Sequence, residues 1–321
     1  MAREPAPAPF IVANPGSGTT LLRMMLDAHP ELAIPPETHF VPEVITRARE
    51  IRRAHDRRPT GAELAAAIAS SRRWEDFGLD EAELAGRMSG RRGESGARAA
   101  IRAFYSLYAE AQHKPRWGDK TPDYIRSIRR IGRTLPEARF VHLVRDGRDV
   151  ALSRRRWRAR AGGRERPIGS WASQWRRWIE TARKHSRDVE HYLEIRYEDL
   201  VAETEATLRR VCEFADLEFQ PAMLDYHERA AERLTELDRS LPAAEGKGAR
   251  AAEHRRAKHA LTAAPPQEEK VEAWRREMSD ADRAAFEAEA GELLAEFGYP
   301  VGEPAGYPGI PGREAEEMPG Q

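Results

Sequence analysis

The sequence predicts an α/β fold in which a mostly parallel β-sheet is flanked by helices and carries helical insertions. Residues 10–13 and 140–144 are short apolar runs with the length of fully buried strands, and a helical pattern follows each of them. Strands that alternate with helices are typical of parallel sheets built from β-α-β units. Ligand sites in such sheets lie at the carboxyl ends of the strands, so we expect the chemistry directly after each predicted strand.

The elements follow one another in a simple order. After the first strand we expect a helix over residues 19–29 and a short strand over residues 32–34. Thr121 is expected to cap a helix whose first position is Pro122. The second half repeats the alternation, with a helix at 148–158, a helix at 170–188, a strand at 192–197, helical sequence at 198–214 and two helices within 268–297.

Residues 1–300 are expected to form a single α/β domain with two additions. Residues 42–112 read as a helical, charged insertion. Residues 241–266 are rich in Ala, Gly, Arg and Lys without periodicity, and they predict a long loop that can close over a ligand. Residues 301–321, with many Pro and Gly, are predicted to be a disordered tail.

Composition excludes several classes of protein. The 321 residues include 53 Lys and Arg, 53 Asp and Glu, and a single cysteine, Cys212. One cysteine cannot form an internal disulfide, which favours a reducing compartment. No apolar run approaches the roughly 18 to 20 residues of a membrane span, and the start lacks an export segment, so we expect a cytoplasmic protein. Zero net charge argues against a general nucleic-acid binder.

The balanced total conceals two segments of opposite charge. Residues 145–166 contain nine Arg against three acids, a net charge of +6. Residues 268–321 carry a net charge of −9. Such segments can pair with each other or face water. The arginines can instead bind phosphate, because a guanidinium offers a planar fork of donors, and the sequence leaves both readings open.

The turn after the first predicted strand has the features of a phosphate site. A Gly-rich turn between a strand and a helix exposes backbone N–H groups at the positive end of the helix dipole. The chain places two glycines and three hydroxyl side chains in this P-loop-like turn: Gly16, Ser17, Gly18, Thr19 and Thr20. We therefore predict a phosphate-binding turn, and the alternative is a tight turn with no ligand.

Two familiar nucleotide motifs do not fit this turn. A P-loop nucleotide kinase or NTPase needs a Lys directly after the last glycine, and here Thr19 follows Gly18. The dinucleotide motif needs a third glycine where this chain has Leu21. No Cys and His cluster has metal-ligand spacing, so no metal is expected.

A second candidate phosphate site follows the strand at 140–144. Arg145 lies where this strand meets a helix, and Ser153 lies eight residues later. Eight residues are close to two helical turns, so both side chains lie on roughly the same face and can hold one phosphate. The alternative is an Arg145 that pairs with Asp149 or faces solvent.

These two segments together resemble a known family. Residues 14–30, NPGSGTTLLRMMLDAHP, resemble the 5′-phosphosulfate loop of sulfotransferases, and most closely that of tyrosylprotein sulfotransferases and related bacterial enzymes. These enzymes use 3′-phosphoadenosine 5′-phosphosulfate (PAPS) as sulfuryl donor. Arg145 and Ser153 fit the family's 3′-phosphate motif. The resemblance extends more weakly over residues 10–299, and it implies a PAPS-dependent sulfotransferase whose single domain has the family's fold.

Sulfuryl transfer needs a base for the acceptor proton and a cation for the departing phosphate. The resemblance implies that Glu37, in the segment that matches a family Glu-Thr, is the base. His39 is the competing candidate, because its ordinary pKa lies nearer neutrality. The family usually has Lys or Arg where this chain has Gly16, so the cationic role passes to Lys120, which resembles the Lys of a family Asn-Lys-Asp-Pro segment.

Other parts of the reaction stay less defined. Tyr197 resembles the family residue that approaches the adenosine. The acceptor is expected to be a hydroxyl or amine on a small molecule, glycan or peptide, but the sequence does not choose among them. The missing cation at Gly16 keeps a further alternative open, namely a non-catalytic protein that binds PAPS or phosphate.

Overall fold

The computed structural model describes residues 5–89, 96–235 and 260–302. They form two compact units, each made of segments distant in sequence. The first comprises Met1–Arg145 with Arg177–Val271, and the second comprises Asp146–Arg176 with Glu272–Gln321. The proposed boundaries of a single domain, 1–300, remain a prediction. Most of the predicted closing loop at 241–266 and nearly all of the predicted tail at 301–321 lie outside the described residues.

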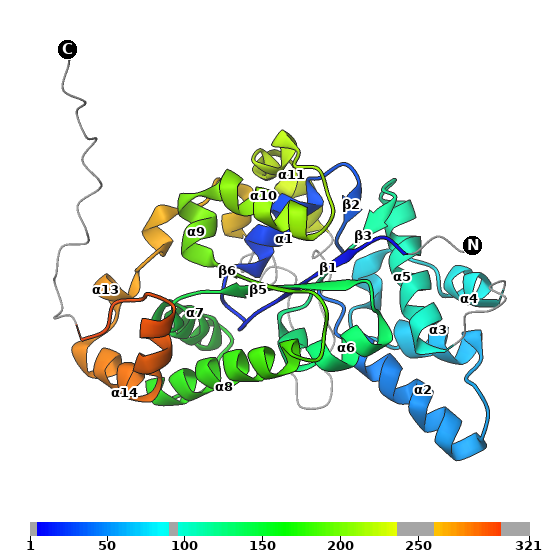
Figure 1. The fold of residues 1–321 in the computed structure, drawn as a ribbon, viewed down its shortest axis with the longest axis horizontal. Coiled ribbons are helices and arrows are strands. Elements are labelled where there is room, and N and C mark those ends of the chain that lie inside the picture. Colours follow the sequence, from blue (N-terminus) through cyan, green and yellow to red (C-terminus); the bar gives the residue numbers. More distant parts are fainter. Residues whose placement is uncertain (1–4, 90–95, 236–259, 303–321) are drawn as a thin grey trace, which may run out of the picture. The chain divides into compact units, whose positions relative to one another are not determined.

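A four-stranded parallel sheet forms the centre of the first unit (Figure 1). Its order is β4-β1-β5-β6, and the strands are β1 (Ala8–Val12), β4 (Asp119–Lys120), β5 (Ala138–Val144) and β6 (Tyr192–Arg196). A parallel pair, β2 (Leu32–Ala33) and β3 (Arg116–Trp117), accompanies it. The predicted α/β fold with a parallel sheet and flanking helices is therefore confirmed.

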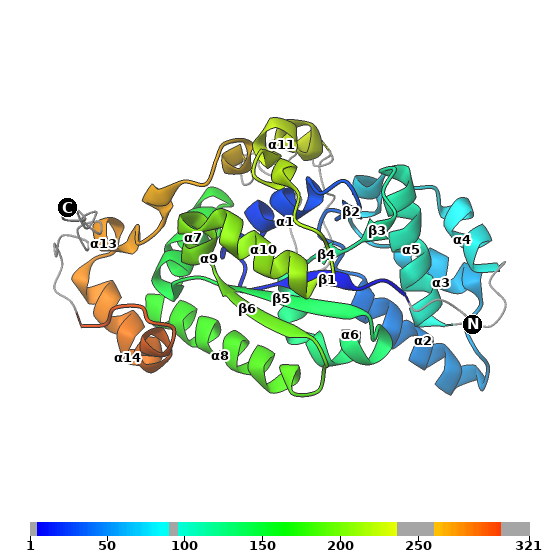
Figure 2. The same ribbon diagram turned by 45° about the horizontal axis from the view of Figure 1, so that its top comes forward.

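Alternate residues of β1 enter two separate apolar cores, as the period of a strand requires. Phe10 and Val12 belong to a core with side chains of α2 (Val41–His55), α3 (Gly61–Ala69), α5 (Ala97–Ala111) and α6 (Ile128–Thr134). Ile11 belongs to a core with side chains of α1 (Thr19–Asp27), α9 (Tyr197–Ala202), α10 (Thr204–Phe214) and α11 (Tyr226–Leu234). Figure 2 shows α10 on one side of β5 and β6, and α6 on the other. Both faces of the strands are covered, which explains why β1 and, apart from Arg139 and His142, β5 read as apolar runs rather than alternating ones.

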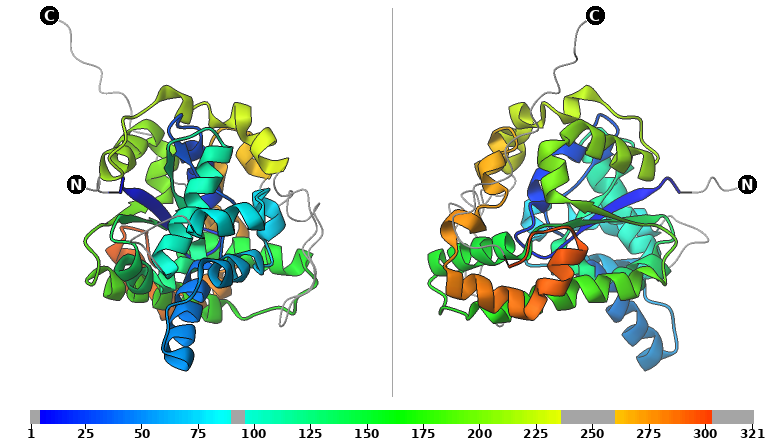
Figure 3. Two further views of the ribbon diagram at one scale, coloured as in Figure 1. Left: turned by 90° about the vertical axis from the view of Figure 1, so that its right-hand side faces the viewer. Right: turned by 60° about the vertical axis from the view of Figure 1, so that its left-hand side comes forward.

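The helices of the first unit follow the predicted alternation. They are α1 (Thr19–Asp27), α2 (Val41–His55), α3 (Gly61–Ala69), α4 (Glu81–Ser89), α5 (Ala97–Ala111), α6 (Ile128–Thr134), α9 (Tyr197–Ala202), α10 (Thr204–Phe214) and α11 (Tyr226–Leu234). Short 3₁₀ turns are η1 (Trp74–Phe77), η2 (Pro122–Arg126), η3 (Pro221–Met223), η5 (Ala260–Ala263) and η6 (Glu268–Lys270). Figure 3 shows α2, in light blue, projecting from the rest of the first unit.

The second unit contains α7 (Gly147–Arg160), α13 (Trp274–Glu277), α14 (Asp280–Glu296) and the first half of α8 (Ile168–Ser186). Within this unit Trp175 packs against Phe286, with ring centroids 6.1 Å apart. A Cβ at Gly147 would lie 2.5 Å from Phe286 and 2.7 Å from Trp175, so the close approach of these rings requires glycine at that position. No helix among the described residues is both long and apolar enough to cross a bilayer.

One local prediction is wrong in detail, and another is refined. Thr121 does not cap the helix at Pro122 through its side chain, and that element is a 3₁₀ turn rather than an α-helix. Its hydroxyl instead accepts a hydrogen bond from the amide of Thr38, 83 residues earlier in the chain, at 3.0 Å. The helical sequence at 198–214 forms two helices, with Glu203 between α9 and α10.

Candidate functional site

The predicted site residues of the first unit gather at one edge of the sheet. β1 ends at Val12 just before the Gly-rich turn, and Lys120 is the last residue of β4. Arg145 directly follows β5, and Tyr197 directly follows β6. Because all four strands are parallel, these positions share the carboxyl edge.

The Gly-rich turn has the backbone of an anion site. Gly16 and Gly18 have φ values of 106° and 92°, a region that favours glycine. Gly18 is the N-cap residue of α1, and no side chain caps this helix, whose first amides have no intrahelical acceptors. The hydroxyl of Ser17 is buried without a hydrogen-bond partner. A phosphate oxygen would satisfy a buried hydroxyl and the helix amides together, so these residues fit a phosphosulfate group.

Tyr197 and Arg145 lie against this turn. A Cβ at Gly18 would lie 2.5 Å from two atoms of the Tyr197 ring, so only glycine leaves room for the ring. The Arg145 guanidinium lies 4.4 Å from the centre of the same ring. It also donates to the carbonyl oxygens of Gly16, at 3.4 Å, and Lys270, at 2.5 Å. Arg145 is thus held beside the turn by a stacked ring and two carbonyl groups.

Ser153, the expected partner of Arg145, lies in α7 and belongs to the second unit. Arg145 belongs to the first unit. Their joint hold on one phosphate therefore remains a prediction from their spacing in the sequence.

Glu37 and Lys120, the predicted base and cation, lie together. The ammonium of Lys120 donates to Oε1 of Glu37 at 3.0 Å. Their side chains are only 11% and 3% exposed, so water screens the pair little. His39 contacts Oε2 of Glu37 through Nε2 at 3.1 Å, so the two candidate bases lie in one cluster.

Arg73 joins this cluster from the helical insertion. Its guanidinium donates to Oε2 of Glu37 at 3.0 Å, and its side chain is 13% exposed. No sequence pattern indicates that the segment at 42–112 takes part in chemistry, because an Arg in a charged helical region has no motif around it. The structure thus adds a second cation to the predicted pair.

A buried hydrogen-bond network fixes the loop that carries Glu37. Thr38 donates to Oδ2 of Asp119 at 2.8 Å, and Tyr105 donates to the same oxygen at 2.8 Å. Because Thr38 has one hydroxyl proton, Tyr124, 2.8 Å away, must donate to it. The amide of Val41 donates to Tyr124 in turn, at 3.0 Å. Thr38 therefore serves as an anchor between Glu37 and His39.

The surroundings change the acidity of this network. Burial raises the pKa of Asp119 to about 6, although the hydrogen bonds from Thr38 and Tyr105 act in the opposite direction. Burial also raises the pKa values of Tyr105 and Tyr124, so both phenols stay protonated as donors. The backbone of His39 has φ 56°, which is uncommon for a residue other than glycine and returns its ring toward Glu37.

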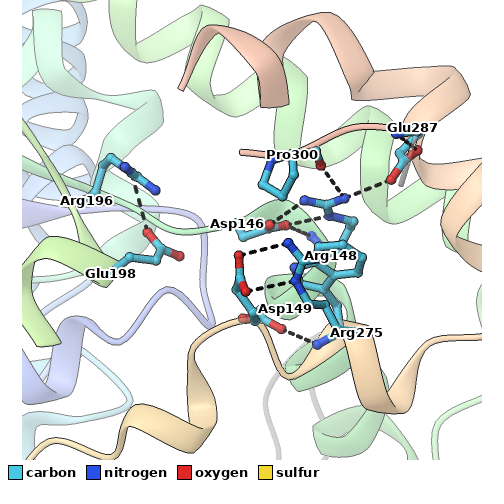
Figure 4. A network of polar contacts seen from close by, with 11 residues as sticks. Asp146, Arg148, Asp149, Arg196, Glu198, Arg275, Glu287 and Pro300 are labelled. Carbon is cyan, nitrogen blue, oxygen red and sulfur yellow. Dashed lines mark hydrogen bonds and ion pairs between the residues drawn. The ribbon is translucent and has the colours of Figure 1, made fainter. Parts of the chain in front are cut away.

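The arginine-rich segment has a different role in the second unit. Arg148 is fully buried, donates to both carboxylate oxygens of Asp146, and lies 3.5 Å from the centre of the Trp274 ring. It also donates to Glu287 and to the carbonyl of Pro300, both at 2.8 Å (Figure 4). Further pairs within this unit join Arg155 to Asp282 and Arg156 to Glu277. Of the two readings of the opposite charges, pairing holds for these arginines.

Comparison with known proteins agrees with this geometry. Residues 7–221 match the sequence model of the sulfotransferase family, so the chain belongs to that family of enzymes. It is 26% identical over 229 residues to protein-tyrosine sulfotransferase A of Caenorhabditis elegans, covering 70% of this chain and 53% of that protein. It is 31% identical over 156 residues to the nodulation protein NoeE of Sinorhizobium fredii, covering 48% of this chain and 33% of that one.

Solved structures show the same fold. The sulfotransferase domain of the Synechococcus PCC 7002 olefin synthase matches with a TM-score of 0.60 and 25% identity, over 93% of this chain and 97% of that one. The sulfotransferase domain of the curacin biosynthetic pathway matches with a TM-score of 0.61 and 22% identity, over 94% and 100% of the two chains. The chain spans about half the length of the tyrosine sulfotransferases that it matches. The predicted family resemblance is confirmed.

Proposed function

We propose that the protein transfers a sulfuryl group from PAPS to a hydroxyl or amine acceptor by in-line displacement. The observation that carries this proposal is the buried contact between Glu37 and Lys120 at the sheet edge that also presents the Gly-rich turn. The register of β1 and β4 pairs Ile11 with Lys120, three residues before the turn begins at Asn14. A base, a cation and an anion site thus share one edge, as group transfer requires.

The donor would bind along the strand ends. The 5′-phosphosulfate would lie in the Gly-rich turn. Backbone amides and hydroxyl groups would come from Ser17, Gly18, Thr19 and Thr20, and Gly16 would supply the left-handed backbone that the turn needs. Arg145 and Ser153 would hold the 3′-phosphate, and Tyr197 would lie beside the nucleotide. The support is the unpartnered Ser17 hydroxyl, the uncapped α1 and the position of Arg145 over the Tyr197 ring.

In the transfer step, the acceptor oxygen or nitrogen forms a bond to the sulfuryl sulfur. The bond from that sulfur to the bridging phosphate oxygen breaks, and its electron pair stays on the departing phosphate. The acceptor proton passes to the Glu37 carboxylate, which faces the site from a rigid loop. Lys120 neutralises the charge that develops on the bridging oxygen. The products are the sulfated acceptor and adenosine 3′,5′-bisphosphate.

The acceptor is defined by its chemical class alone. A hydroxyl or amine on a small molecule, a glycan or a peptide satisfies the step above. The tyrosine sulfotransferases among the relatives suggest phenols as the first acceptors to test. The cytoplasmic location expected from the sequence stays a prediction.

The proposal is tested with sulfur-labelled PAPS and a panel of phenols, alcohols and amines, in single-turnover and steady-state assays. Glu37→Gln should lower turnover about 10²- to 10⁴-fold, the usual contribution of a general base, while calorimetry shows unchanged binding of the bisphosphate product. Glu63→Gln is the matched control, because Glu63 also pairs with an arginine but lies in the N-terminal capping box of α3.

Three other outcomes would favour a different function or a different base. Tight donor binding with no labelled acceptor in the wild type would favour a binding protein. Label transfer to a nucleotide phosphate would favour a kinase-like activity. Full turnover by Glu37→Gln would reassign the base to His39.

A further inference from the structure

We propose that Arg73, in the helical insertion, is a positioning residue that orients the Glu37 carboxylate for proton transfer. This inference rests on the proposed role of Glu37 as the base. It gives the segment at 42–112 a part in the reaction, where sequence patterns indicate only surface helices.

The contacts divide the two oxygens of Glu37 between different partners. Oε1 receives Lys120, whereas Oε2 receives Arg73 and contacts His39. The terminal torsion of a glutamate is soft, so a carboxylate held through one oxygen can turn about it. Charge-assisted bonds on both oxygens prevent that rotation, and they are strong where water has little access. Arg73 therefore fixes the plane of the carboxylate.

The backbone that carries Arg73 is itself well anchored. Arg73 precedes η1, and its carbonyl accepts from the amide of Asp76 at 2.9 Å. Phe77 of η1 packs edge-on against Phe40, with ring centroids 6.3 Å apart. Both rings also contact Phe104, with centroids 4.7 and 4.9 Å away. Since Phe40 is three residues after Glu37, one aromatic cluster sets the positions of both partners.

The charges around Glu37 affect the pH dependence of kcat/KM, which can be measured. Among the described residues, the charged and titratable groups in contact with it include Lys120 from β4, Arg73 from the turn before η1, and His39 from its own loop. His39 in turn lies 3.9 Å from Asp123 of η2 through Nδ1. Neighbouring cations stabilise an ionised carboxylate, so they keep the base unprotonated at lower pH. Removing one cation should move the acid limb of kcat/KM toward higher pH.

The experiment measures kcat, KM and pH profiles for Arg73→Gln and Arg73→Lys with PAPS and an active acceptor. Arg73→Gln should lower kcat about tenfold and leave the KM for PAPS nearly unchanged, because orientation rather than donor binding is lost. Its acid limb should lie about one pH unit higher. Arg73→Lys keeps the charge, so the acid limb should return to the wild-type position.

Arg57→Gln provides the matched control. Arg57 lies in the same insertion and pairs with Glu63 through both carboxylate oxygens, but it is exposed and outside the Glu37 cluster. Circular dichroism and thermal unfolding verify that each variant is folded. If the acid limb of Arg73→Gln coincides with that of Arg57→Gln, the inference is overturned, even when kcat falls. Activity retained by Glu37→Gln would instead overturn the assigned base, so the two failures are distinguishable.

Discussion

Two clusters of buried charge, one in each unit, have opposite compositions. In the first unit a single carboxylate, Glu37, meets two permanent cations, Lys120 and Arg73. In the second unit a single cation, Arg148, meets two carboxylates, Asp146 and Glu287. The Arg148 cluster satisfies its guanidinium within the protein and braces α7 against the segments around it. In the Glu37 cluster two cations share one carboxylate, at the sheet edge where the anionic donor is proposed to bind.

A dense run of arginines does not by itself mark a functional site. The arginine-rich segment lies mostly in the second unit, where Arg148, Arg155 and Arg156 pair with carboxylates. Glu37, a carboxylate that meets two cations, lies instead in the first unit, and its partners Arg73 and Lys120 are more than 30 residues away in the chain. Three predictions probe this difference, in order of decreasing expected free-energy change.

The largest effect is expected from Arg148→Met. The substitution leaves two buried carboxylates without their shared cation, which typically costs about 3–5 kcal/mol of stability. Urea unfolding should show a much lower midpoint. Arg155→Gln, whose pair with Asp282 is about one-third exposed, should cost less than about 1 kcal/mol. Equal midpoints for the two variants would contradict the idea of a buried brace.

Lys120→Met should have its main effect on catalysis. Loss of a cation placed at developing charge lowers kcat about 10²- to 10³-fold, or about 3–4 kcal/mol of barrier. The comparison variant is Lys114→Met, because Lys114 is also a poorly exposed lysine but donates to the backbone carbonyl of Leu32. Its kcat per folded molecule should match the wild type. A similar loss in both variants would mean that Lys120 acts only through the fold.

Asp119→Asn should give the smallest change, visible as a function of pH. The native protein holds the Asp119 proton up to about pH 6, whereas an unfolded chain releases it near 3.9, so this group makes stability fall as pH rises between those values. The corresponding free energy is about 2–3 kcal/mol. Unfolding measured at pH 4, 5, 6 and 7 should show a weaker decline in the variant. An unchanged profile would assign the decline to other groups.

The sequence predicted the fold and part of the site for different physical reasons. The runs at 10–13 and 140–144 predict β1 and β5 because strands covered on both faces are mostly apolar, and His142 is accommodated by its contacts with Tyr192 and Glu194. Glu37 and Lys120 are predicted from the family resemblance of the short segments that carry them. Their contact follows from the parallel pairing of β2 with β3, which places Ala33 beside Trp117, four residues before Glu37 and three before Lys120.

Arg73 and the Thr38 network could not be predicted in this way. Arg73 reaches Glu37 because Phe77, Phe40 and Phe104 pack together. These residues are distant in the sequence, so no local pattern predicts their packing. Thr121 shows the same limit. Its local sequence predicts a helix cap, but a distant amide takes the hydroxyl instead.

The left-handed backbone at residue 16 has a consequence for engineering. Its φ of 106° suits a residue without a side chain, whereas the resemblance to sulfotransferases leads us to expect a long basic one there. A basic residue at position 16 would therefore require a reshaped loop in addition to the substitution itself. Attempts to add a cation at residue 16 should begin by redesigning residues 14–18 as one block.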